Sequence, residues 1–236
     1  MKVSRNLLKA FCIANILCFS FFVQNTYSQT KKNGEVYNPD GIELVYVEGN
    51  GNIKGFYIGK YEITQKEWNS VMDTNRSKFN GDNLPVENVS WDDAQEFINR
   101  LNEKTGKNYR LPTEAEWEYV AKGGSNNNTY EYAGSNNIDE VTWYEKNSDD
   151  KTHAVGTKNP NTLGIYDMSG NVWEWCQDKC RWDSEKKEVV LDEKGSNYVG
   201  CGGGWNGAAS GCRVAHRHSY DPSHRRSNLG FRVVIP

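Results

Sequence analysis

The first half of the chain carries three copies of one helix-start pattern. In each copy a hydroxyl side chain is followed three residues later by an acid, in the pairs Thr64 and Glu67, Ser90 and Asp93, and Thr113 and Glu116. The hydroxyl can accept a hydrogen bond from an unpaired N–H of the first turn, and the acid can accept one from the cap residue. The pattern therefore predicts three helices before residue 124, each with a defined start.

The second of these helices has the clearest sequence pattern. Apolar side chains recur at helical spacing at Ala94, Phe97, Ile98 and Leu101. Gly106 then provides a stop, because glycine accepts the left-handed conformation that ends many helices. The third helix is short, and we expect Trp117 and Val120 to face inward.

The rest of the chain favours strands and irregular structure. Residues 42–47 and 56–63 are rich in β-branched and aromatic side chains and predict two early strands. After residue 124 helical periodicity disappears, and the 22 glycines indicate many turns. We therefore expect an α+β fold with short helices, short strands and much irregular structure.

The N-terminal segment has the features of a signal peptide. A positively charged start, with Lys2, Arg5 and Lys9, precedes an apolar run over residues 10–23. The small residues Thr26 and Ser28 suit a cleavage site. We therefore predict that residues 1–28 are removed and that the mature protein is secreted or periplasmic.

The apolar run is shorter than the roughly 18–20 residues that a membrane-spanning helix needs, so we expect no stable span once the signal is removed. We do not expect lipid anchoring at Cys18, because Leu17 stands where a lipoprotein site needs a small residue. Residues 29–40 are polar and predict a flexible lead-in. A single domain then occupies residues 41–236.

The net charge of the mature chain indicates which class of partner is disfavoured. The signal segment holds three of the 28 basic residues and none of the 31 acidic ones, so the mature chain carries six more acids than bases. This acidic balance argues against nucleic acid as a partner.

The cysteines that remain after signal removal are even in number. They are Cys176, Cys180, Cys201 and Cys212. In an exported chain this favours two disulfides, for which three connectivities exist. A four-cysteine zinc site is the alternative, and the ten residues between Cys201 and Cys212 disfavour it.

Five segments together resemble the formylglycine-generating (sulfatase-modifying factor) enzyme family. They are residues 61–68 (YEITQKEW), 84–94 (LPVENVSWDDA), 110–119 (RLPTEAEWEY), 163–175 (LGIYDMSGNVWEW) and 228–233 (NLGFRV). Their order over residues 40–236 makes the resemblance specific. It implies a fold related to C-type lectin-like domains.

The resemblance also implies several activities. Active members oxidise a sulfatase cysteine to formylglycine, using copper held by two cysteine thiolates. Related sulfoxide synthases use iron held largely by another domain. Other relatives have no established reaction, and some display variable binding surfaces.

This sequence departs from the catalytic pattern of the family. The first catalytic cysteine position falls on Gly207 and the second on Cys212, while Gly204 replaces the serine of the preceding glycine turn. Copper(I) prefers two soft thiolate ligands, and glycine offers none. We therefore do not expect copper. We do not expect iron either, because no compact motif supplies two histidines and a carboxylate. The resemblance instead suggests that Cys212 pairs with Cys176, and that Cys180 then pairs with Cys201.

The resemblance further implies a structural Ca²⁺ site on one segment. Asp167 and Glu174 would supply carboxylate oxygens, and Gly170 and Val172 would supply backbone carbonyls. Oxygen ligands of this kind are what Ca²⁺ requires. The alternative is a hydrogen-bonded turn in which the two acids cap backbone amides.

A ligand groove is expected near the glycine turn. We predict that Trp173, Trp205, Asn206 and Arg213 line it, with core packing of the tryptophans as the alternative.

His216 and His218, two residues apart, could ligate zinc or iron on one face of a strand. The alternative is a pair of exposed histidines with no metal.

Three functions stay open at this point. The leading one is a non-catalytic module that binds a protein or peptide with residues 205–226. The others are an oxidoreductase of the family with iron-type oxygenase chemistry, and formylglycine generation with Cys212 and an unexpected ligand.

Overall fold

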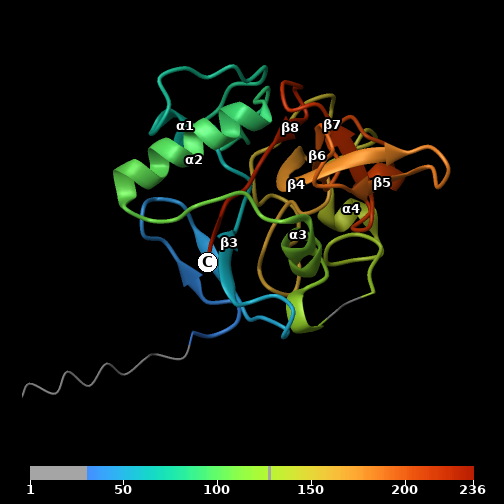
Figure 1. The fold of residues 1–236 in the computed structure, drawn as a ribbon, viewed down its shortest axis with the longest axis horizontal. Coiled ribbons are helices and arrows are strands. Elements are labelled where there is room, and N and C mark those ends of the chain that lie inside the picture. The colour runs from blue at the N-terminus through green and yellow to red at the C-terminus, as the bar shows by residue number, and fades with distance from the viewer. Residues whose placement is uncertain (1–30, 127–128) are drawn as a thin grey trace, which may run out of the picture. The chain divides into compact units, whose positions relative to one another are not determined.

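The computed structural model describes residues 31–126 and 129–236 (Figure 1). The predicted signal peptide, residues 1–28, lies outside the described residues. Over the described ranges, no helix combines the length and apolar character needed to cross a membrane.

The three predicted helices begin where their caps predicted. They are α1 (Gln65–Asn69), α2 (Trp91–Thr105) and α3 (Glu114–Ala121), and each has both hydrogen bonds of a capping box. Gly106, with φ of 69°, ends α2 in the left-handed conformation. A one-turn helix, α4 (Ile138–Val141), also forms in the region without helical periodicity, where the Asn137 side chain accepts from the Asp139 N–H.

One antiparallel sheet joins the two ends of the described chain. Its strand order is β1–β2–β3–β9, with β1 (Val36–Tyr37), β2 (Leu44–Val47), β3 (Phe56–Gly59) and β9 (Val234–Ile235). The two predicted strands are present as β2 and β3, in shorter form. β1 lies inside the segment expected to be a flexible lead-in, where Val36 and Tyr37 pair with Val45 and Leu44.

The second sheet is built from strands of the C-terminal half of the chain. Its order is β5–β4–β6–β7, and β8 pairs in parallel with β4. The strands are β4 (Trp173–Asp183), β5 (Glu188–Leu191), β6 (Asn197–Cys201), β7 (Arg217–Tyr220) and β8 (Leu229–Gly230). In Figure 1 the β4–β5 hairpin extends away from the rest of this sheet.

Large aromatic side chains fill much of the core. The largest fully buried ones are Trp117, Trp175, Phe56, Phe97 and Phe231. Trp68 stacks on Phe97 with ring centroids 5.4 Å apart, and Phe231 meets both rings edge-on. Aromatic contacts of this kind supply much of the stabilisation when aliphatic side chains are few.

Candidate functional site

The glycine turn after β6 brings Cys212 into the interior. Gly202 and Gly203 both have positive φ, and a Cβ on Gly203 would lie 2.6 Å from the Cys212 Sγ. The Cys212 side chain is fully buried and packs with Tyr132, Val141 and Tyr144. Burial raises the pKa of its thiol to about 12, so the thiol form dominates at neutral pH.

Gly207 occupies a tight turn beside this cysteine. Its N–H donates to the Gly204 carbonyl at 2.8 Å, and its own carbonyl accepts from the Glu145 N–H at 3.1 Å. Cys201 packs in a different core cluster from Cys212. Among the described cysteines, Cys212 is therefore alone in its core cluster.

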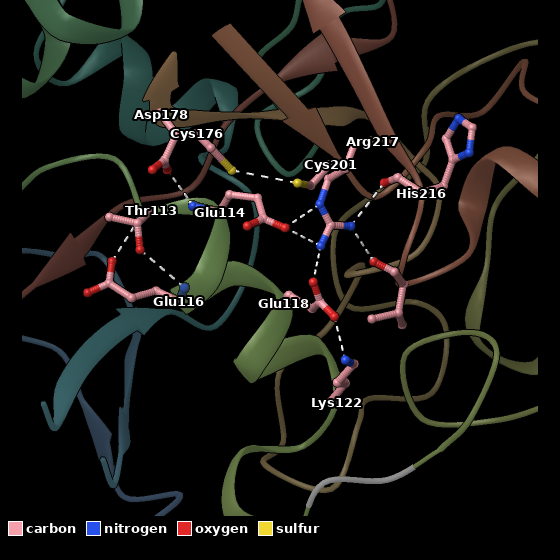
Figure 2. A network of polar contacts seen from close by, with 11 residues as sticks. Thr113, Glu114, Glu116, Glu118, Lys122, Cys176, Asp178, Cys201, His216 and Arg217 are labelled. Atoms are coloured by element: carbon pink, nitrogen blue, oxygen red, sulfur yellow. Dashed lines mark hydrogen bonds and ion pairs between the residues drawn. The ribbon is translucent and has the colours of Figure 1, made fainter. Parts of the chain in front are cut away.

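The four cysteines of the described chain are free, buried thiols. The Cys176 and Cys201 sulfurs lie 3.7 Å apart on the neighbouring strands β4 and β6 (Figure 2). Cys180 lies in the same cluster, with its sulfur 3.4 Å from the Ser219 hydroxyl. The expected Cys176–Cys212 pairing is thus not the one that the strands bring together, because Cys212 lies beyond the glycine turn.

The segment expected to hold Ca²⁺ instead places Glu174 in a buried ion pair. Arg232 donates to both oxygens of Glu174 at 2.7 Å, and the Trp117 indole N–H donates to one of them at 2.8 Å. All three side chains are fully buried. The Glu174 carboxylate is therefore engaged by protein donors.

Two further carboxylates lie in this buried region. Asp167 accepts from the Gly156 N–H at 2.7 Å, and Glu62 accepts from the Asn171 amide and the Val172 N–H. Burial raises the pKa of Asp167 to about 6 and that of Glu62 well above its usual value. Glu62 was not predicted as a site residue, although it lies in the first of the five family-like segments.

The buried region carries more acids than bases. Three carboxylates, those of Glu62, Asp167 and Glu174, share the single buried guanidinium of Arg232. As they stand, no three His, Cys, Asp or Glu side chains of the described chain form a metal-binding group. The charge nevertheless fits a cation beside Asp167 and Glu62, with Glu174 held by Arg232.

The predicted groove residues divide into packed rings and exposed polar groups. Trp173 is 6% exposed and contacts His216, His218 and Tyr220, with ring centroids 5.6–6.2 Å apart. The rings of His216 and His218 therefore pack against the Trp173 indole. Trp175, two residues further along β4, is fully buried in the core.

Trp205 anchors the turn beside the groove. It is also 6% exposed, donates from its indole N–H to the Ser227 carbonyl at 2.8 Å, and meets the Phe79 ring edge-on at 5.5 Å. Asn206, the next residue, is exposed, and so is Arg213. The Asn206 side-chain oxygen accepts from the Asn228 amide at 2.7 Å.

Residues 32–236 match the sulfatase-modifying factor enzyme 1-like domain. The chain belongs to this family. The chaperone protein LppX of Paenibacillus barcinonensis is 35% identical over 239 residues, covering 80% of this chain and 83% of that protein. The inactive C-alpha-formylglycine-generating enzyme 2 of Bos taurus is 30% identical over 161 residues, covering 64% of this chain and 50% of that protein.

Solved structures show the same fold. Treponema denticola variable protein 1 superposes with a TM-score of 0.73 at 30% identity, covering 85% of this chain and 98% of that one. The predicted α+β fold of the formylglycine-generating enzyme type is thereby confirmed.

In this sulfatase-modifying factor-like domain, an ion-pair network braces α3 against β7 close to the thiols (Figure 2). Arg217 contacts the carboxylates of Glu114 and Glu118, and it also donates to the Val214 carbonyl at 2.7 Å. Asp178 accepts from the Glu114 N–H at 2.6 Å. The sequence patterns did not predict this network because its charged partners are 64 to 103 residues apart.

Proposed function

We propose that this domain is an exported, non-catalytic binding module for a protein or peptide. The observation that carries the proposal is the loss of the thiolate pair. Gly207 stands at one catalytic position, and Cys212 at the other is a buried thiol whose pKa is about 12. A copper oxidase of this family would need two accessible thiolates, which this arrangement does not offer.

The binding surface in this proposal covers residues 205–226. It includes the exposed polar side chains of Asn206 and Arg213 and the nearly buried ring of Trp205. Polar groups around a packed aromatic anchor are common at interfaces between proteins. The bovine relative described as inactive supports a non-catalytic role for a member of this family. The N-terminal sequence supports export.

The catalytic part is tested with a sulfatase-type cysteine peptide. The purified protein is incubated with the peptide, copper and a reductant, and the peptide is analysed by mass spectrometry. We expect the cysteine to stay unchanged, while an active formylglycine-generating enzyme converts it under the same conditions. Conversion by this protein would refute the proposal.

We also propose that Ca²⁺ stabilises the fold beside Asp167 and Glu62. The excess of buried carboxylates over the one buried guanidinium supports this, because a divalent cation would neutralise it. The backbone carbonyls of Gly170 and Val172 would complete the ligand set.

Thermal unfolding in EGTA and in excess Ca²⁺ tests this ion. Saturation at a hundred times the dissociation constant should raise the melting temperature by roughly 4 °C or more. An equal melting temperature in both buffers, with no heat of Ca²⁺ binding by calorimetry, would exclude the ion.

A further inference from the structure

Two adjoining pockets beside Trp205 share Lys78, and together we call them the basic groove. The first has a volume of about 620 Å³ and includes Lys151, Thr152 and His153 in its lining. The second has a volume of about 390 Å³ and includes Arg225, Arg226 and Asn206. None of the residues lining either pocket is acidic. The chain as a whole has more acids than bases, so this surface differs from the average one.

Most of the positive charge in the basic groove lacks a counterion. Arg225 is paired with Asp93 through two contacts of 2.7 and 2.8 Å. For Lys78, Lys151 and Arg226, no carboxylate of the described chain lies within ion-pair distance, and all three are exposed. Their charges are therefore available to a ligand.

Glu87 interacts electrostatically with Lys78 but does not fully neutralise its charge. Glu87 is fully buried, and one of its oxygens accepts from the Phe79 N–H at 2.9 Å. Burial raises the pKa of Glu87 to about 7, so its carboxyl is only partly ionised at neutral pH.

The basic groove also offers an apolar wall. Phe79 lines the first pocket with Leu84, and its ring contacts Trp205. An apolar side chain of a ligand can pack on this wall.

We propose that the basic groove binds an acidic peptide segment in which carboxylates flank an apolar side chain. The carboxylates pair with Arg226 and Lys78 at one end and with Lys151 at the other. The apolar side chain packs on Phe79. The apolar wall between the charged ends favours a peptide over an anionic polysaccharide. This assignment rests on the proposed binding function and names its ligand class.

Fluorescence anisotropy with a labelled Asp-Glu-Leu-Glu-Asp peptide and the purified exported protein tests the assignment. We expect saturable binding that weakens as NaCl rises, since salt screens exposed charges. Lys78→Gln and Arg226→Gln should each weaken binding about fivefold or more. Lys186→Gln, an equal charge change on the β4–β5 hairpin, should leave it unchanged. The three sites are exposed, and matching melting temperatures verify the folds.

Three results would overturn the assignment. One is no binding of the acidic peptide, and another is equal binding of a Lys-Arg-Leu-Arg-Lys peptide. The third is binding of polygalacturonate without binding of the acidic peptide. This result would mean that the basic groove binds an anionic polysaccharide. None of these results depends on the copper assay, so the non-catalytic proposal stands or falls separately.

Discussion

Asp167 sits in the left-handed region, with φ of 58°, and buries its carboxylate beside Glu62 and Glu174. Its folded pKa of about 6 lies above the ordinary value of 3.8, so folding favours the protonated acid. Without a cation, this group therefore lowers stability as pH rises from about 4 to 6, and its cost persists above pH 6.

The raised pKa of Asp167 leads to a prediction for the variant Asp167→Asn. In EGTA, the variant should gain melting temperature relative to the wild type at pH 7 and lose that advantage at pH 4.5. Excess Ca²⁺ at pH 7 should reverse the order, because the ion needs the carboxylate. An advantage of the variant that is the same at both pH values would contradict the assigned ionisation of Asp167.

The Glu174–Arg232 pair leads to a second prediction about single residues. Arg232→Met should leave the Glu174 charge buried without its partner and destabilise the fold by about 3–5 kcal/mol. Urea unfolding followed by fluorescence measures the loss. Adding Glu174→Gln to this variant should restore part of the stability, and the absence of any recovery would mean that the loss came from packing.

At the level of elements, strand pairing decides which thiols meet. β4 and β6 are antiparallel with Glu174 opposite Cys201, and this register brings the Cys176 and Cys201 sulfurs into contact. The Cys212 sulfur lies with Tyr132 and Tyr144 instead.

Treatment of the reduced protein with diamide should therefore link Cys176 to Cys201. Each thiol gives up one hydrogen to diamide, which is reduced to its hydrazine, and a disulfide forms. Non-reducing peptide mapping reads out the linkage, and Cys176→Ser serves as the control that cannot form it. Recovery of a Cys176–Cys212 peptide as the main product would contradict the observed strand arrangement.

At the level of the whole molecule, the thiols report on global unfolding. Cys176, Cys180, Cys201 and Cys212 are all fully buried, in two separate core clusters. We expect the reduced, folded protein to react slowly with Ellman's reagent and all four thiols to react at once in guanidinium chloride. Rapid reaction of one thiol in the folded state would indicate local opening around it.

The distance between interacting residues separates what could be predicted from what could not. The starts of α1, α2 and α3 follow from hydrogen bonds between residues three apart, so their caps are readable in the sequence. The end of α2 at Gly106 is equally local. The family and its fold also follow from sequence motifs in order.

The tertiary structure alone decided the pairings between distant segments. Glu174 meets Arg232 from 58 residues away, and Cys176 meets Cys201 across two strands. The basic groove combines residues near positions 78, 151 and 226, which no sequence window contains. Sequence determined the local hydrogen bonds and the residue types. Burial and charge depend on which segments pack together, and that is a property of the folded chain.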